Sequence, residues 1–223
     1  IIMDGNRRWA KERKLSGSLG HKAGVDNLKK LLVHIFDRGI RYVSVYAFST
    51  ENFKREQKEV DYLMNLFRTY FRKEFQEIID RNVKVVFSGR RENIPDSVWD
   101  SMKYLEDQTR DGKNGILNIC LNYGGQYEIL DMTKKVCQLV LENKISIDQI
   151  DLSVIEENLY QKIPAVDLMI RTSGEFRISN FMLYQTAYAE YYFPTTYFPD
   201  FNDEHFEQAL LEYNKRNRRF GGN

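Results

Sequence analysis

The sequence predicts a single α/β domain, residues 1–223, with a mostly parallel central sheet and helices on both faces. Short runs rich in β-branched and aromatic residues alternate with longer amphipathic runs along the whole chain. Polar, glycine-containing loops follow the strands, and parallel sheets bind their ligands at that edge. No change of composition and no internal repeat marks a second domain.

Five runs have the β-branched or aromatic content of buried strands: 1–3, 42–48, 83–87, 116–121 and 166–170. Apolar residues spaced by three and four, with glycine or proline at the ends, predict six helices. These helices span 20–38, 56–81, 95–109, 125–142, 151–160 and 203–214, and 9–14 is also compatible with a helix. The segment 181–192 fits a helix or a strand equally well.

Composition limits the class of function. The net charge of +1 argues against a nucleic-acid partner. No apolar run has the length of about 18 residues that a membrane span needs, and three histidines without ligand spacing argue against zinc. Cys120 and Cys137 lie in apolar surroundings and are predicted to be buried thiols. Because the sequence begins within a predicted strand, we expect further residues before Ile1.

The stretch Met3-Asp4-Gly5-Asn6-Arg7-Arg8-Trp9 joins the first strand to a helix. At such a turn, free backbone N–H groups and the helix dipole point towards a ligand. A carboxylate and two guanidiniums in the same turn indicate a diphosphate held with a divalent cation. These residues alone leave one alternative open, a polar surface turn in which Asp or Asn caps the helix.

A second dense group of polar residues follows the 166–170 strand. Arg171, Arg177 and Ser179 belong to it, and Glu175 lies between the two arginines in sequence. Arginines gathered on one face repel each other, so a bound phosphate ester is a simple explanation for them. A salt-bridged surface loop, with Glu175 orienting the arginines, is the alternative.

Two isolated ionisable residues are further candidates. Glu190 lies in an aromatic and apolar run, where an unpaired carboxylate is costly and needs a metal ion, an arginine or solvent. His21 follows a glycine at a predicted helix start, where its ring could face the same edge of the sheet. It could equally be an ordinary polar residue of the first turn.

The predicted 56–81 helix has a long apolar face rich in Phe and Tyr. Such a face either packs the core or walls a cavity for a chain-like apolar ligand. Burial would stabilise each five-carbon unit of such a ligand by up to about 4 kcal/mol. Composition does not choose between these two interpretations.

Eight blocks, in chain order, carry a family resemblance: 3–10 (MDGNRRWA), 20–24 (GHKAG), 46–52 (YAFSTEN), 122–125 (NYGG), 167–175 (DLMIRTSGE), 177–181 (RISNF), 188–190 (YAE) and 218–222 (RRFGG). The ordered set resembles the cis-prenyltransferases, the undecaprenyl diphosphate synthase family. Many members have Gly at the position of Arg7, so this chain gains a guanidinium there.

The resemblance implies a role for each matched residue. Asp4 matches the essential acid that works with Mg²⁺, and Glu190 matches a second Mg²⁺-linked acid. The loop that cradles the allylic diphosphate corresponds to Gly5, Asn6, Arg7, Arg8 and Trp9, with His21 beside it. The isopentenyl diphosphate site corresponds to Arg171, Arg177 and Ser179. Polar residues at the reacting centre correspond to Ser49, Asn52 and Arg55. The base that takes the proton could be the diphosphate itself, Asp4, or Ser49 or Asn52 with a water.

The resemblance also implies substrates and partners. We expect a homodimer that condenses farnesyl diphosphate, or a similar allylic diphosphate, with successive isopentenyl diphosphates. The Z-polyprenyl product would be the undecaprenyl carrier-lipid precursor of the bacterial cell wall. A shorter-chain synthase and a non-catalytic subunit are the alternatives. The 56–81 helix and the 83–87 strand are expected to wall the product tunnel. The protein is expected to be cytoplasmic and to associate with the membrane through its product.

Overall fold

The computed structural model describes residues 1–216 and confirms the predicted α/β class. Its strands are β1 (Tyr42–Ser49), β2 (Val83–Ser88), β3 (Gly115–Tyr123), β4 (Leu168–Ile170) and β5 (Glu190–Tyr192). β3 lies between β1 and β2, and all three are parallel. β4 and β5 form a second parallel pair.

Ile2 joins the two sheets. It forms parallel bridges to Tyr46 of β1 and to Arg171, directly after β4. The predicted strand 1–3 is therefore reduced to a single bridging residue. The connection nevertheless places Asp4, two residues later, at the carboxyl ends of β1 and β4, where the ligand site of a parallel sheet is expected.

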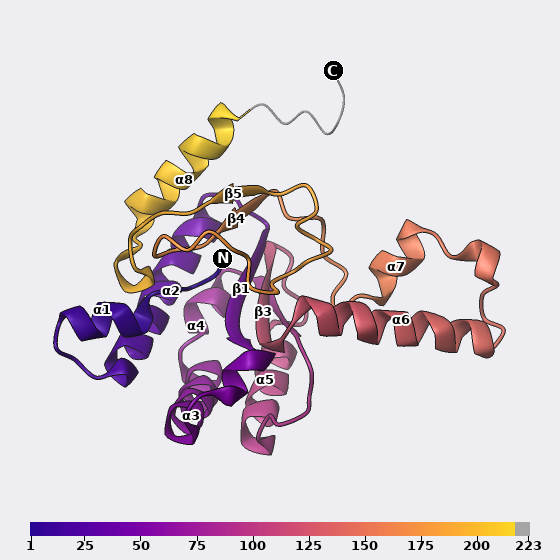
Figure 1. Ribbon diagram of the computed structural model, residues 1–223, viewed down its shortest axis with the longest axis horizontal. Coiled ribbons are helices and arrows are strands. Elements are labelled where there is room, and N and C mark those ends of the chain that lie inside the picture. Colours follow the sequence, from indigo (N-terminus) through magenta and orange to yellow (C-terminus); the bar gives the residue numbers. More distant parts are fainter. Residues whose placement is uncertain (217–223) are drawn as a thin grey trace.

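The helices are α1 (Asn6–Glu12), α2 (Gly17–Asp37), α3 (Gln57–Lys73), α4 (Gln76–Asp80), α5 (Asp96–Thr109), α6 (Gly125–Leu141), α7 (Leu152–Asn158) and α8 (Asp203–Lys215). Short 3₁₀ turns are η1 (Thr50–Lys54), η2 (Ile147–Gln149) and η3 (Phe198–Asp200). α6 and α7 project from the body of the molecule as an arm (Figure 1). The ambiguous 181–192 segment consists of turns that lead into β5.

Two helix predictions need correction. α2 begins three residues before the predicted start, because the Ser16 side chain caps it by accepting from Leu19 N. The predicted 56–81 helix is two helices, α3 and α4, with a break at Glu74 and Phe75. Phe75 is buried and continues the apolar spacing of α3, so hydrophobic periodicity could not reveal the break.

Successive residues of β3 face opposite sides of the sheet. Leu117, Ile119 and Leu121 belong to the larger core cluster, which helices α2, α3 and α5 complete. Cys120 faces the other cluster, which includes Phe181. Both faces of the sheet are therefore covered, as the prediction required.

The α6–α7 arm has only a small core of its own. Met132 and Val136 of α6 pack against Leu159. Cys137, predicted to be buried, is exposed on α6, whereas Cys120 is buried as predicted. The local apolar neighbours of Cys137 misled the prediction because α6 projects away from the main body, and much of its surface meets solvent.

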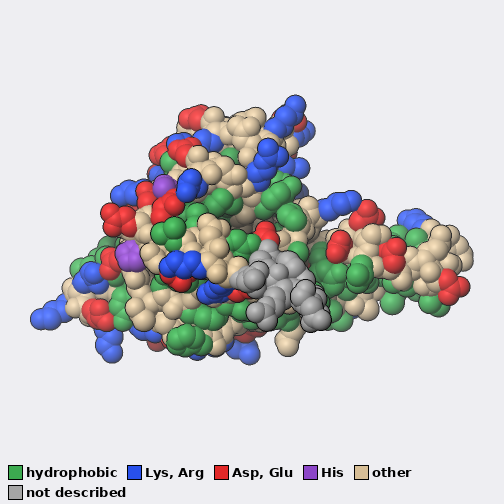
Figure 2. Space-filling model, turned by 90° about the horizontal axis from the view of Figure 1, so that it is seen from above, with side chains coloured by type: hydrophobic (Ala, Val, Ile, Leu, Met, Phe, Trp, Pro, Cys, Tyr) green, Lys and Arg blue, Asp and Glu red, His purple; other side chains and the backbone are tan. Residues whose placement is uncertain are grey.

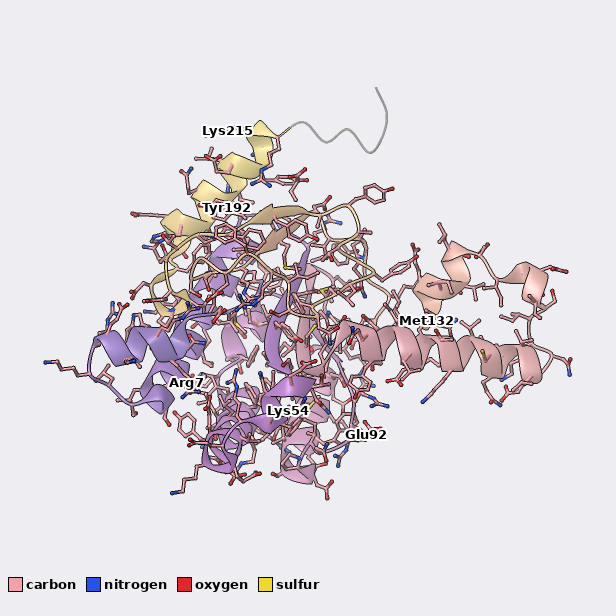
Figure 3. All side chains as sticks on the ribbon, viewed as in Figure 1. Arg7, Lys54, Glu92, Met132, Tyr192 and Lys215 are labelled. Atoms are coloured by element: carbon pink, nitrogen blue, oxygen red, sulfur yellow. The ribbon has the colours of Figure 1, made fainter. Side chains whose placement is uncertain are left out.

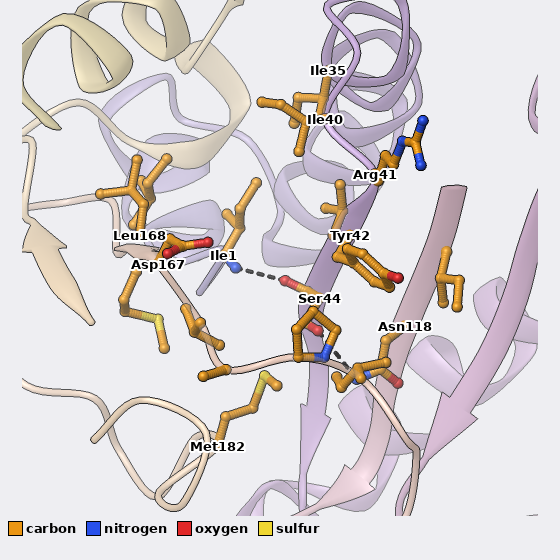
Figure 4. A pocket seen from close by; sticks show the side chains of 18 of the residues that line it. Ile1, Ile35, Ile40, Arg41, Tyr42, Ser44, Asn118, Asp167, Leu168 and Met182 are labelled. Atoms are coloured by element: carbon orange, nitrogen blue, oxygen red, sulfur yellow. Dashed lines mark hydrogen bonds between the residues drawn. The ribbon is translucent and has the colours of Figure 1, made fainter. Parts of the chain in front are cut away.

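A cavity of about 320 Å³ lies near the amino ends of β1, β3 and β4. Its lining includes Ile1, Ser44 and Asn118; Ile1 N donates to Ser44 O over 2.6 Å (Figure 4). This cavity is at the opposite end of the strands from Asp4 and Arg171.

The outer surface agrees with the small net charge. Acidic and basic side chains are interspersed over the face seen from above (Figure 2). Within residues 1–216, no helix is long and apolar enough to cross a membrane.

Candidate active site

Gly5 forms the turn between the first bridge and α1. Its φ of 96° lies in the left-handed region, which favours glycine. A Cβ at this position would lie 2.6 Å from Tyr197 Cδ1 and 2.9 Å from Ser173 Cβ. Gly5 N donates to Asp4 Oδ1 over 2.6 Å, so the turn fixes the direction of the Asp4 carboxylate.

Asp4 is held at the centre of the site. Arg171 Nη2 donates to Asp4 Oδ2 over 2.9 Å, and Arg8 Nη2 lies 3.3 Å from Oδ1. Burial acts to raise the pKa of the Asp4 carboxyl, but the hydrogen bond and charge of Arg171, with Gly5 N–H and Arg8, outweigh burial. The pKa is held below its ordinary value of 3.8, so Asp4 is a carboxylate at neutral pH.

The loop after β4 folds around Arg171. Nη1 of this buried side chain donates to Ser179 Oγ over 2.6 Å and to Arg177 O over 2.7 Å. Arg171 thereby shapes the loop that presents Arg177, whose side chain is 59% exposed. The predicted group of Arg171, Arg177 and Ser179 is thus brought together, with Arg177 as the accessible member.

Glu175 bridges two arginines from different segments. Its Oε1 lies 2.8 Å from Arg8 Nη1, and its Oε2 lies 2.5 Å from Arg177 Nη1. Arg8 also donates to Ser173 Oγ over 2.5 Å. Glu175 orients Arg177, as the sequence suggested, but its second partner is Arg8; Arg171 pairs with Asp4 instead. We call Arg8, Glu175 and Arg177 the Glu175 cluster.

A matching arrangement lies on the other side of α1. Glu59 Oε2 is 3.1 Å from Arg7 Nη1, and Glu59 Oε1 accepts from Arg55 Nη1 over 2.9 Å. His21 Nε2 is 3.2 Å from the same Oε1. Figure 3 labels Arg7, on α1, and Lys54, the last residue of η1, which precedes Arg55. We call Arg7, His21, Arg55 and Glu59 the Glu59 cluster.

Sequence reasoning missed Glu59. It lies in the first turn of α3 and reads there as an ordinary surface acid. Its spacing of four residues from Arg55 was the one available signal, because such pairs meet on a helix. The contacts with Arg7 and His21 depend on how α1 and α2 pack.

Burial lowers the pKa of His21 below its ordinary value of 6.5; the hydrogen bond to Glu59 opposes this only in part, and the charges of Arg55 and Arg7 add to it. His21 is therefore neutral at pH 7. Burial also acts to raise the pKa of Glu59, but Arg55, His21 and Arg7 together hold it below the ordinary value. The cluster thus contains two cationic arginines and one carboxylate.

The polar loops converge as predicted, and Asn180 connects three of them. Asn180 Nδ2 donates to Glu51 Oε1 over 3.1 Å, in the loop after β1. Asn180 O and Oδ1 accept from Gly125 N (2.7 Å) and Gln126 N (2.9 Å), after β3. Ser49, the last residue of β1, caps η1, and its backbone N donates to Oδ1 of Asn52 in η1 over 3.1 Å.

An apolar cavity of about 80 Å³ opens beside the Glu59 cluster. His21 and Asn6 are among its polar lining residues, and Asn6 Oδ1 is buried without a hydrogen-bond partner in the described structure. Apolar residues of α2, α3, β1 and β3 complete the lining, among them Leu28, Phe67 and Phe71. This gives the aromatic face of α3 a cavity to line as well as a core to pack.

The predicted second wall does not line this cavity. No residue of 83–87 is among its lining residues, and α2 takes that place. β2 lies on the far side of β3 from β1, and Phe87 of β2 packs behind the lining, with its ring centroid 5.0 Å from that of Phe71. Sequence order had suggested β2 because it follows α3 and α4 directly.

Trp9 and Glu190 were also predicted site residues, but each contacts a residue outside both clusters. Trp9 Nε1 donates to Asp200 over 2.7 Å, away from Asp4. Glu190 pairs with Arg216 at 2.8 Å. In the register of β4 and β5, Glu190 lies level with Leu168, three residues before Arg171. At about 3.3 Å per residue, the backbone of Glu190 is therefore roughly 10 Å from the level of Arg171, towards the amino ends of the strands.

Comparison with known proteins identifies the family of the chain. The family model described as "Putative undecaprenyl diphosphate synthase" matches residues 2–221. The chain belongs to the undecaprenyl diphosphate synthase family, the cis-prenyltransferases. The Pyrococcus horikoshii tritrans,polycis-undecaprenyl-diphosphate synthase (geranylgeranyl-diphosphate specific) is 45% identical over 99% of this chain and 85% of its own length.

Two further relatives are associated with other allylic diphosphates. The Legionella pneumophila ditrans,polycis-undecaprenyl-diphosphate synthase ((2E,6E)-farnesyl-diphosphate specific) is 41% identical over 99% of this chain and 93% of its own. Lavandulyl diphosphate synthase from Lavandula x intermedia, solved with dimethylallyl diphosphate, superimposes with a TM-score of 0.96. It is 33% identical and covers 99% of this chain and 96% of that chain.

The structure explains one of the blocks that the cis-prenyltransferase resemblance rests on. In the 20–24 block, a Cβ on Gly20 would lie 2.1 Å from Asn6 O, and one on Gly24 would lie 2.3 Å from Asn6 Oδ1. These glycines let α2 approach the Asp4 loop closely. The tail block 218–222 lies outside the described residues.

Proposed function

We propose that this cis-prenyltransferase condenses an allylic diphosphate with isopentenyl diphosphate, forming a Z double bond at each addition. One observation carries the proposal: an apolar cavity opens directly beside arginine clusters. An allylic diphosphate has this division between an apolar chain and a polyanionic head. The two clusters, one on each side of α1, suit the two diphosphates of the reaction.

The allylic diphosphate is assigned to the Glu59 cluster, because His21 of that cluster also lines the cavity that would take the attached chain. Isopentenyl diphosphate is assigned to the Glu175 cluster, where Arg177 is the accessible guanidinium. Asp4 contacts Arg8 of the Glu175 cluster and is held by Arg171, which shapes the loop that presents Arg177. Farnesyl diphosphate is our first choice of primer, as for the Legionella relative.

The residues serve the departure of diphosphate from the allylic carbon. Negative charge then grows on the leaving group, and guanidiniums fixed beforehand stabilise it without reorganisation. Arg7 and Arg55, in the cluster assigned to the allylic diphosphate, are fixed in this way by Glu59. The alkene of isopentenyl diphosphate forms the new C–C bond to the allylic carbon as its C–O bond to diphosphate breaks. A proton then passes from the new chain to a base, for which the released diphosphate, Asp4, and Ser49 or Asn52 with a water are the candidates.

Mg²⁺ is the proposed cofactor, and the donor set fits it. Mg²⁺ in phosphate sites is bound by one or two carboxylates with substrate oxygens and water. Within residues 1–216, no group of three acidic, His or Cys side chains forms a metal site, whereas Asp4 supplies one carboxylate beside Arg8 of the Glu175 cluster. When bound, Mg²⁺ would neutralise charge on the diphosphates. The register of β5 gives Glu190 no support as a second ligand.

The cavity bears on product length. Its volume of about 80 Å³ is roughly half that of an engineered cavity that takes up benzene. A growing chain therefore requires side chains such as Phe67 and Phe71 to move aside. We retain an undecaprenyl product as the proposal and a shorter chain as the alternative that these aromatic residues favour.

Assembly and membrane contact are part of the same proposal. The arm exposes large apolar side chains on α6, η2 and α7: Leu130, Leu141, Ile147 and Leu152. A second copy of the chain would remove this surface from water, giving a homodimer. The apolar product would link the enzyme to a membrane on release.

A direct assay tests the proposal. Purified protein is incubated with farnesyl diphosphate, radiolabelled isopentenyl diphosphate and Mg²⁺, and products are sized by chromatography. We expect labelled Z-prenyl products that disappear when EDTA is added and return with excess Mg²⁺. Absence of labelled product with dimethylallyl, farnesyl and geranylgeranyl diphosphates would contradict it.

A further inference from the structure

Glu59 connects three segments that are separate in sequence. It contacts Arg7 in α1, His21 in α2 and Arg55 just before its own helix, α3. Its side chain is 17% exposed, whereas that of Arg7 is 66% exposed. The carboxylate therefore fixes the end of a side chain that would otherwise sample many rotamers.

The contacts leave the arginines able to bind an anion. A guanidinium carries five N–H donors, and the contact with Glu59 is made through Nη1 of Arg7 and of Arg55. Without the carboxylate, the two cations would repel each other and separate. Glu175 holds Arg8 and Arg177 in the same way, so the protein uses this arrangement on both sides of α1.

We propose that Glu59 is a positioning residue for the allylic diphosphate, holding Arg7, Arg55 and His21 around one binding position. The proposal rests on the proposed function. It places Glu59 on the allylic side because His21 lines the apolar cavity. By the same reasoning, Glu175 positions the arginines for the other diphosphate. The cluster also ties the start of α3, a wall of the cavity, to the head of the substrate.

The test compares two matched variants, Glu59→Gln and Glu175→Gln, which remove a charge and keep the shape of the side chain. Glu59→Gln should raise the KM for farnesyl diphosphate by about tenfold, and the KM for isopentenyl diphosphate by less than about twofold. Glu175→Gln should show the reverse preference. Glu59→Asp should recover part of the loss.

A double-mutant cycle separates positioning from general destabilisation. Arg7→Ala should have a smaller effect on the farnesyl KM in the Glu59→Gln background than in the wild type, because Arg7 has already lost its support. Fully additive effects, equal changes in both KM values, or a lower farnesyl KM in Glu59→Gln would overturn the proposal. So would a lower Tm with both KM values unchanged.

Binding without turnover keeps the inference distinct from the proposed function. Calorimetry with farnesyl thiodiphosphate, a non-reacting analogue, should give weaker binding to Glu59→Gln than to Glu175→Gln. If the wild type bound the analogue but made no product, the proposed function would fail while this comparison still tested Glu59. Equal affinities of the two variants would overturn the role of Glu59.

Discussion

Asp4 and Arg171 are 167 residues apart in sequence, and Arg171 Nη2 donates to Asp4 Oδ2 over 2.9 Å. The Arg171 side chain is 6% exposed, so its charge depends on this carboxylate and on the loop oxygens around it. The pair joins the acid of the first loop to the loop that presents Arg177. Removing either partner leaves the other without its counter-charge. A variant of Asp4 or Arg171 therefore affects both the site and the stability of the fold.

Replacing Asp4 should abolish chain elongation. Asp4→Asn keeps the shape of the side chain but removes the charge opposite Arg171 and Arg8, and we expect turnover to fall by at least about a hundredfold. Asp4→Ala should also lower stability by about 1–3 kcal/mol, because it removes a charged hydrogen-bond partner. Product formation and thermal unfolding measure the two effects.

Asp37→Asn is the control for Asp4, because Asp37 pairs with Arg81 on the surface, far along α2. It should retain turnover. If Asp4→Asn retained turnover within about twofold of the wild type, Asp4 would have no part in the mechanism.

Arg177→Ala should raise the KM for isopentenyl diphosphate by about tenfold, since it removes an exposed charged donor from the Glu175 cluster. The KM for farnesyl diphosphate should change less. Arg177 is a better probe than Arg171, whose buried side chain also shapes the loop. Arg110→Ala, at an equally exposed surface arginine, should change neither KM. Equal effects of Arg177→Ala on both substrates would contradict the assignment of the two clusters.

Phe71→Ala should lengthen the product by one or more five-carbon units, because Phe71 lines the cavity. It should also destabilise the fold by about 3–5 kcal/mol, as truncation of a buried Phe does. Leu105→Ala, in the core but outside the cavity lining, should destabilise comparably and leave product length unchanged. Chromatography of the products measures their chain length. An unchanged length in Phe71→Ala would show that Phe71 packs the core and does not restrict the product.

His21 should make stability depend on pH. The pKa of His21 in the folded protein lies below its ordinary value of 6.5. Between the folded pKa and 6.5, the unfolded chain therefore binds more protons than the folded one. Stability is therefore fully present above about pH 6.5 and is lost as the pH falls towards the folded pKa. Urea unfolding of the wild type and His21→Gln between pH 5 and 8 measures this, and we expect a smaller loss in the variant. The same loss in both proteins would show that His21 is not the source.

Much of the fold was predictable because its signals are local. Alternation in β3 and the three-and-four spacing in α2 and α5 arise from the geometry of each element. The break at Glu74 was not predictable, since Phe75 and Ile78 keep the spacing of a continuous helix. Cys137 was misjudged for a related reason: apolar neighbours in sequence do not reveal that α6 projects from the body.

For the site, the family, the dense polar loops and most of the residues in them could be predicted without a structure. Their residue types and order are sufficient for that, and parallel strands bring such loops to one edge. Which partner each residue has became clear from the folded chain alone. Glu59 lies 38 residues from its partner His21 in sequence. Trp9 donates to Asp200, and Glu190, the first residue of β5, pairs with Arg216. Ion pairs of this kind are set by how separate segments pack, and local sequence patterns carry no information on that packing.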